Sequence, residues 1–150
     1  MYKILVVSDD ETCQNQLNDK LEKWEYEVMF AKDGNEALNM LRTELFDLVM
    51  PEIHLQDTSG VQLMEQIHQE FKLPVILISA DDNYDVMSDA IKKGAMFVFT
   101  KPFTTTNLKS IWIHIFNWRK EMYYKKGKGK QDPDIGGSSD ENLVFRLMNH

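Results

Sequence analysis

The stretch that decides the fold class covers residues 4–12 and has the sequence ILVVSDDET. Its first four residues form a short, continuous apolar run rich in branched side chains, as expected of a strand buried on both faces of a sheet. Asp10, Glu11 and Thr12 then offer helix-starting chemistry, because short polar side chains satisfy the free amides of a helix's first turn. The stretch therefore predicts a buried strand that leads directly into a helix.

The same alternation continues to about residue 120. Further apolar runs predict strands at residues 26–31, 46–50, 75–78 and 97–99. Each run is followed by apolar residues at helical spacing, and Gly94 can end the fourth helix in a left-handed conformation. Five short strands alternating with five helices predict an α/β fold, in which a doubly wound, five-stranded parallel sheet is flanked by five helices.

The second half of the predicted domain is rich in apolar residues at regular spacing. Strand and helix periods account for the aromatic residues most simply as core, with exposure of some of them on the surface of this half of the domain as the alternative: Phe97, Phe99, Trp112 and Phe116. The predicted fourth helix is lined by a further apolar set: Val86, Met87, Ala90 and Ile91.

The composition is that of an ordinary folded domain. The chain has 150 residues, of which 43% are hydrophobic and 27% charged, with a formal net charge of -7 that argues against a uniformly basic nucleic-acid surface. The single cysteine, Cys13, cannot form an internal disulfide, which fits a reducing compartment. The N-terminal apolar run is too short for a signal peptide or a membrane span, so we expect a nuclear or cytoplasmic location without a membrane partner.

Residues 122–150 differ in composition from the domain predicted at residues 1–121. A lysine and glycine run at residues 125–130 is followed by an acidic stretch rich in glycine and serine. Such a segment cannot bury enough apolar area to offset its ordering entropy, so we expect a flexible tail. The lysine run is expected to be a solvated linker, with a nuclear-entry signal or a weak nucleic-acid patch as the alternative.

Polar side chains follow directly after the predicted strands. Ligands of doubly wound sheets bind at the carboxyl ends of the strands, where these side chains converge. They belong to Ser8, Asp9, Asp10, Glu52, Ser79 and Lys101. Helix capping alone would explain the first three, and a plain strand-end hydroxyl would explain Ser79. No glycine-rich phosphate loop follows any strand, so flavin or nucleotide binding lacks support.

The order and spacing of these residues resemble the receiver domains of response regulators. The resemblance covers roughly residues 2–120 and rests on four segments: ILVVSDD at 4–10, FDLVMPEIH at 46–54, ISA at 78–80 and KPF at 101–103. The segment Ile53-His54-Leu55, together with Cys13, is most similar to the receivers of plant type-B transcriptional regulators. The resemblance implies a flavodoxin-like, CheY-like (βα)5 fold.

Working receivers take a phosphoryl group from histidine onto an aspartate, with the help of a divalent metal, a lysine and a hydroxyl. The resemblance places this chain's residues at the corresponding positions: Ser8 and Asp9 at the acidic pair, Glu52 at the acceptor, Ser79 at the hydroxyl, Lys101 and Pro102 at the lysine segment, and Val98 at the aromatic switch. Asp10, one residue out of register, could partly replace Ser8 as a metal contact.

Several of these positions depart from the family pattern. Glu52 carries its carboxylate one methylene further out than aspartate, Ser8 removes a charge from the metal site, and Val98 has no ring to rotate. Gln56 and Ser59 stand where the family usually has proline and aspartate. Departures at the acceptor, the metal site and the switch together favour loss of phosphoryl chemistry.

Two other aspartates are not expected to replace the acceptor, because Asp47 is predicted inside the third strand and Asp57 well beyond its end. We expect Glu52 to pair with Lys101 rather than to activate the domain constitutively. We predict no required cofactor, with weak Mg²⁺ binding at Asp9 as the alternative.

We therefore predict a non-catalytic pseudo-receiver, not an enzyme, in a plant phosphorelay, with cytokinin signalling suggested by the sub-family resemblance. It is expected to act through phosphorylation-independent protein–protein interaction and to modulate histidine-to-aspartate signalling. The expected partners are a histidine phosphotransfer protein, a histidine kinase or other response regulators. The alternatives are a functional phosphorelay receiver with an unorthodox acceptor site and the N-terminal part of a type-B-like regulator of transcription. Residues 121–150 are too short and too glycine-rich to hold a DNA-binding domain, so this segment is not expected to bind DNA.

Overall fold

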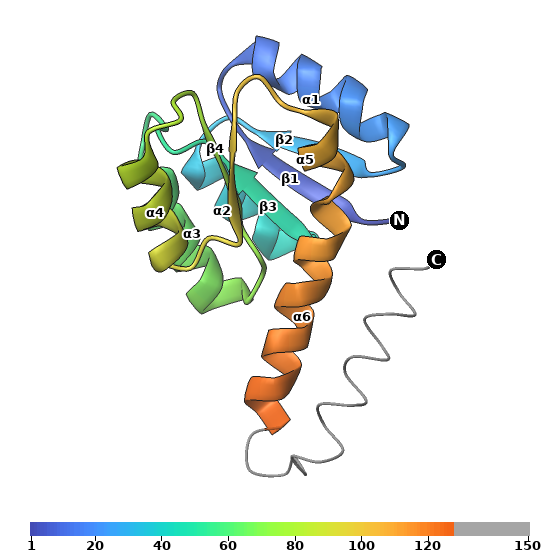
Figure 1. Cartoon of the computed structure of the whole chain (residues 1–150), viewed down its shortest axis with the longest axis vertical. Helices are drawn as coiled ribbons and strands as arrows, with labels where there is room; N and C mark the ends of the chain where they lie inside the picture. The colour runs from blue at the N-terminus through green and yellow to red at the C-terminus, as the bar shows by residue number, and fades with distance from the viewer. Residues whose placement is uncertain (128–150) are drawn as a thin grey trace. The chain divides into compact units, whose positions relative to one another are not determined.

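The computed structural model describes residues 1–127, and the remainder of the predicted tail, residues 128–150, lies outside the described residues (Figure 1). The chain divides into two compact units, Met1–Trp118 and Arg119–His150, and the strands found among the described residues lie in the first unit. The elements in chain order are β1 (Lys3–Val7), α1 (Glu11–Lys23), β2 (Glu27–Ala31), α2 (Gly34–Thr43), β3 (Leu48–Pro51), α3 (Gly60–Phe71), β4 (Ile76–Ser79), α4 (Tyr84–Lys92), β5 (Phe97–Thr100), α5 (Thr105–Lys109) and α6 (Ile111–Gly127).

All strand pairings are parallel, as the sequence predicts. β1 pairs with β2 on one side and with β3 on the other, and β4 pairs with β5. Isolated parallel bridges from Val49 to Val75 and from Glu52 to Ile78 connect β3 with β4. Where the sequence predicts one five-stranded sheet, the strands thus form a three-stranded and a two-stranded parallel sheet, which these two bridges join side by side with their carboxyl ends at one edge.

The core consists of two apolar clusters, one on each face of the sheet. Alternate residues of β1 enter different clusters, with Leu5 and Val7 in one and Ile4 and Val6 in the other. The first cluster is completed by residues of α2, α3 and α4, and the second by residues of α1, α5 and α6. This burial on both faces explains the continuous apolar run at residues 4–7.

Residues 1–127 contain six helical segments, where the sequence predicts five helices. The predicted last helix is divided at Ser110, whose hydroxyl donates to the carbonyl of Asn107 at 2.8 Å and closes α5. α6 then continues to Gly127, so residues 122–127, which we assigned to the tail, are helical. In the part of the chain that is described, no helix is long and apolar enough to cross a membrane.

The aromatic residues assigned to the core differ in their burial. Phe99 is fully buried, whereas Trp112 and Phe116 are only half-buried. Phe97 is 37% exposed and stacks on the ring of His114, with ring centroids 5.5 Å apart. Phe97 is therefore the exposed member of this set: it lies on the same face of β5 as Phe99, with ring centroids 5.8 Å apart, but stands at the start of the strand.

Candidate functional site

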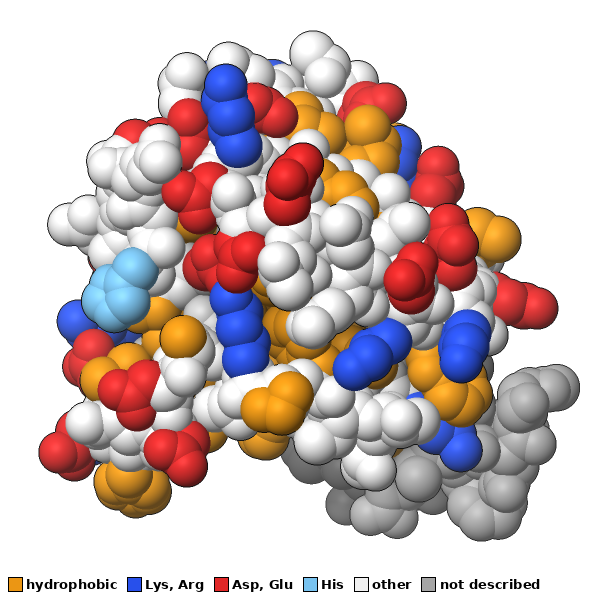
Figure 2. Space-filling model, turned by 90° about the horizontal axis from the view of Figure 1, so that it is seen from above, with side chains coloured by type: hydrophobic (Ala, Val, Ile, Leu, Met, Phe, Trp, Pro, Cys, Tyr) orange, Lys and Arg blue, Asp and Glu red, His pale blue; other side chains and the backbone are white. Residues whose placement is uncertain are grey.

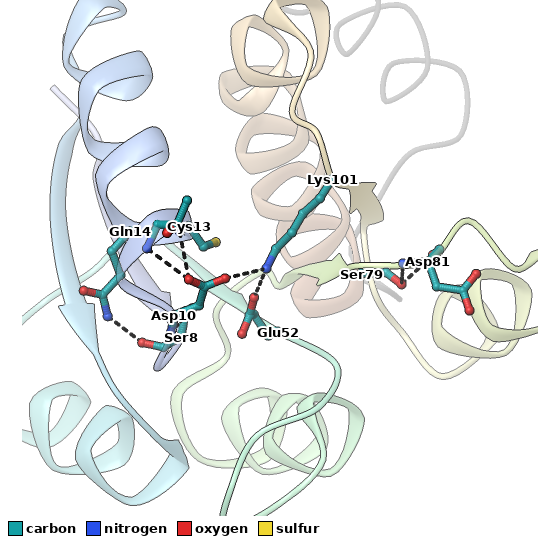
Figure 3. A network of polar contacts seen from close by, with 9 residues as sticks. Ser8, Asp10, Cys13, Gln14, Glu52, Ser79, Asp81 and Lys101 are labelled. Atoms are coloured by element: carbon teal, nitrogen blue, oxygen red, sulfur yellow. Dashed lines mark hydrogen bonds and ion pairs between the residues drawn. The ribbon is translucent and has the colours of Figure 1, made fainter.

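Acidic side chains are interspersed with lysine and arginine side chains on the face of the molecule that Figure 2 shows. A cluster of two carboxylates and one ammonium group lies at the carboxyl edge of the sheet (Figure 3). Lys101 follows β5, Glu52 follows β3, and Asp10 precedes α1. The parallel register of β1 with β3 brings the residues after these two strands together, although they are far apart in the sequence. We call Asp10, Glu52 and Lys101 the carboxylate–lysine cluster.

Lys101 is the centre of this cluster. Its Nζ donates a short hydrogen bond to Oε1 of Glu52 and lies 3.6 Å from Oδ2 of Asp10. Burial would lower the pKa of Lys101, but the hydrogen bond to Glu52 and the nearby carboxylates outweigh it and raise that pKa above its ordinary value. The ammonium group is therefore held in its charged form, and the predicted pairing of Glu52 with Lys101 is present.

Asp10 has a second structural role. Its Oδ1 accepts hydrogen bonds from the backbone amides of Thr12, at 3.0 Å, and Cys13, at 3.4 Å, which makes it the N-cap of α1. The capping prediction is thus confirmed for Asp10. Both oxygens of this carboxylate are engaged, one by the first turn of the helix and the other by Lys101.

The two residues before Asp10 have opposite environments. Ser8 is fully buried, and its Oγ accepts a hydrogen bond from the backbone amide of Asp10 at 3.1 Å. The thiol of Cys13 also lies beside the hydroxyl of Ser8, and burial raises the pKa of this thiol. Asp9 is exposed, and its carboxylate makes no hydrogen bond or ion pair with the residues that the structure describes.

The hydroxyl of Ser79 faces its own loop. Its Oγ donates to the carbonyl of Asp81 at 2.6 Å and accepts from the Asp81 amide at 3.2 Å, and Figure 3 places this pair apart from Glu52 and Lys101. Val98, at the switch position, is buried in the core. Pro102 is exposed after a cis Lys101–Pro102 peptide bond.

Neither of the remaining candidate aspartates reaches the cluster. Asp47 precedes β3 instead of lying inside it, and its Oδ2 accepts from the backbone amide of Lys3 at 2.7 Å. The carboxylate of Asp57 accepts from the amides of Gly34 and Asn35, both at 2.9 Å, and these bonds lower the pKa of Asp57. This role is not evident from the sequence, because Asp57 binds the first amides of a helix that precedes it in the chain.

The fold and this cluster define the class of protein. A family model of the response regulator receiver domain matches residues 4–112, so the chain belongs to that family. The receiver domain of the Francisella response regulator 1452 is similar in structure, with a TM-score of 0.69 and 27% identity, covering 81% of this chain and 99% of that one. A CheY-like receiver domain protein from Methanospirillum hungatei JF-1 gives a TM-score of 0.71 at 26% identity, covering 81% and 98%.

Within this class, the chain is homologous to plant two-component response regulators. "Two-component response regulator ORR21" from Oryza sativa is 38% identical over 150 residues, which cover 99% of this chain and 21% of that protein. "Two-component response regulator ARR2" from Arabidopsis thaliana is 35% identical over 141 residues, covering 92% and 21%. The chain thus spans about a fifth of the length of these relatives.

The family implies a divalent metal ion, and the residues of this pocket do not fit one. Mg²⁺ requires near-octahedral oxygen ligands, normally including one or two carboxylates. Here the carboxylates of Asp10 and Glu52 are bound to Lys101, and Ser8 supplies a buried neutral hydroxyl. Among the residues that the structure describes, no group of three or more His, Cys, Asp or Glu side chains is arranged to hold a metal ion.

Proposed function

We propose that this chain is a pseudo-receiver, a protein-docking module that has the receiver fold but does not accept a phosphoryl group. The observation that carries the proposal is the hydrogen-bonded ion pair between Lys101 and Glu52, the residue at the acceptor position. A carboxylate that already neutralises the lysine is a poor nucleophile for a phosphoryl group, whose charge that lysine would have to balance.

Three further features support the loss of phosphoryl chemistry. An acyl phosphate on Glu52 would stand about 1 Å or more beyond the position that an aspartate gives it, and errors of that size commonly abolish positioned chemistry. The hydroxyl of Ser79 is bonded to Asp81 instead of being directed at Glu52. Val98 has no ring with which to transmit a change in the pocket.

Glu52 is also a weak substitute for a phosphorylated aspartate. It supplies one negative charge, whereas a phosphoryl group supplies nearly two. That single charge is already paired with Lys101, so little remains to attract other groups in the pocket. We therefore assign Glu52 a structural role in place of constitutive activation.

Two modes of action fit a docking module of this kind. In the first, the domain competes with working receivers for a histidine phosphotransfer protein and damps the relay. In the second, it associates with other response regulators or with a histidine kinase, independently of phosphorylation, through α4 and β5. The apolar side chains exposed there, Tyr84, Val86, Ile91 and Phe97, favour the second mode. A nuclear or cytoplasmic location and a place in cytokinin signalling are part of this proposal.

Phosphotransfer from a radiolabelled histidine phosphotransfer protein, with Mg²⁺ present, tests the proposal. We expect no label on the wild-type chain and none on Glu52→Gln, while the donor still binds both. Label on Glu52→Asp alone would place the defect in a single methylene. Uptake of label by the wild type that Glu52→Gln loses would refute the proposal and identify a working relay receiver. A pull-down of the same donor provides the binding measurement.

A further inference from the structure

We propose that the ammonium group of Lys101 is the resident cation of this pocket and excludes a divalent metal ion from it. The inference goes beyond the proposed function, because it concerns the charge balance of the pocket and not the fate of a phosphoryl group. It starts from the way in which Lys101 connects the ends of β3 and β5 with the first turn of α1 (Figure 3).

Three of the four carboxylate oxygens of Asp10 and Glu52 already have partners. Oε1 of Glu52 accepts from Lys101, Oδ2 of Asp10 lies 3.6 Å from the same nitrogen, and Oδ1 of Asp10 caps α1. A metal ion that used Glu52 and Asp10 together would have to displace the ammonium group and share Asp10 with the helix amides. It would also stand beside a positive charge.

The other two candidate metal ligands are Ser8 and Asp9. Ser8 is neutral and fully buried, and its Oγ is fixed by the Asp10 amide. Asp9 keeps an exposed carboxylate that makes no ion pair with the residues described. A single exposed carboxylate does not meet the demand of Mg²⁺ for several oxygens in near-ideal geometry, so Asp9 alone does not form a site.

The ion pair with Glu52 stabilises the side chain of Lys101 in its position. Its side chain is 26% exposed and that of Glu52 is 13% exposed, so their hydrogen bond is partly shielded from water. Partial shielding strengthens a charge-assisted hydrogen bond relative to one on the open surface. The raised pKa of Lys101 agrees with a cation that is stabilised in place.

The test uses Mn²⁺ as a paramagnetic probe and the amide NMR signals of residues 8–10 and 52–53 as the readout. For the wild type we expect no broadening confined to these amides, and none that Mg²⁺ reverses. Lys101→Met should gain localised broadening and bind Mn²⁺ about ten- to hundredfold more tightly, because one positive charge beside both carboxylates is removed. Glu52→Gln in the Lys101→Met background should abolish the gain.

The matched control is Lys93→Met, which removes the same charge from an exposed ion pair with Asp89 on α4. It should bind Mn²⁺ no better than the wild type. Localised, Mg²⁺-reversible broadening in the wild type would overturn the inference, and this measurement does not depend on any variant. A folded Lys101→Met that binds no better than Lys93→Met would also overturn it, since the ammonium group would not then be what excludes the ion.

Discussion

Helices α3 and α4 follow the neighbouring strands β3 and β4, but they use their apolar residues differently. α3 buries Leu63, Met64 and Ile67 in the core. α4 buries only Ala90, and its Val86 and Ile91 are exposed, although the sequence shows a similar apolar periodicity in both helices. A hydrophobic stripe therefore does not by itself tell whether a helix is anchored to the core or presents that stripe to a partner.

The two helices also differ in their relation to the pocket around Glu52. α3 begins where the loop after Glu52 returns to the sheet, and the amide of Gly60 donates to the carbonyl of Ile53 at 2.6 Å. α4 instead begins at a local cap, in which the side chain of Asn83 accepts from the amides of Asp85 and Val86. α3 thus holds Glu52 in position, whereas α4 is free to offer its outer face.

The largest effect is expected from Met64→Ala in α3. Met64 is fully buried, and loss of a side chain of this size from a core costs about 2–5 kcal/mol of the free energy of unfolding. Ile91→Ala in α4 is the matched control and should cost far less, because Ile91 is already 45% exposed. Chemical denaturation measures the free energy of unfolding of both variants. Equal losses would contradict the difference in burial between α3 and α4.

The next effect concerns the glycine at the start of α3. A Cβ at Gly60 would lie 2.3 Å from the backbone oxygen of Glu52, which is too close for any real contact. Gly60→Ala should therefore cost about 1–3 kcal/mol and move the loop that carries Glu52. Urea unfolding gives the cost, and the amide shifts of Glu52 and Lys101 show the movement. Unchanged shifts would mean that α3 does not position the pocket.

A smaller effect is expected from Asp57→Ala, which removes the carboxylate that the loop before α3 adds to the N-cap Asp33 at the start of α2. The cost should be about 1 kcal/mol at neutral pH, since Asp57 is exposed and its bonds are partly screened. The folded-state pKa of Asp57 is lowered, so its contribution is complete above the ordinary value of 3.8 and is lost as the pH falls through the folded-state pKa.

Denaturation of the wild type and Asp57→Ala at neutral and at acidic pH measures this difference. The two stabilities should converge as the pH falls below the ordinary pKa of the carboxyl. Curves that stayed parallel at every pH would show that the charge of Asp57 contributes nothing to the cap.

The smallest effect on stability is expected from Tyr84→Ser in α4. Tyr84 is 79% exposed, so the free energy of unfolding should change by about 0.5 kcal/mol or less. If α4 is the docking surface of the proposed module, binding to the partner should nevertheless weaken. Partner titration by calorimetry separates the two quantities, and intact binding would remove Tyr84 from the docking surface.

The sequence was a good guide where local rules decide the structure. The continuous apolar run of β1, the cap by Asp10 and the convergence of Glu52 with Lys101 follow from strand burial, helix-end chemistry and the topology of parallel sheets. These features need no knowledge of distant packing. Residues close in sequence, or placed at the same edge by topology, suffice to predict them.

The sequence failed where distant or competing contacts decide. Asp57 binds the start of α2 although the two are far apart in the sequence. The hydroxyl of Ser79 bonds to Asp81 in its own loop, and the sequence alone does not distinguish this partner from one across the pocket. The break at Ser110 depends on hydrogen bonds that tighten one turn of an otherwise helical pattern. Such outcomes are set by tertiary geometry, which overrides local preference.

The thiol of Cys13 can report local opening of the protein at the start of α1. Cys13 is the single cysteine of the chain, it is 2% exposed, and its thiol lies against Ser8 beneath the first turn of α1. A thiol reagent reaches it only when that turn leaves the sheet, so the labelling rate of the native protein measures how often this happens. Because the same turn is bound to Lys101 through Asp10, that rate measures how firmly the ion pairs hold α1 at the edge of the sheet.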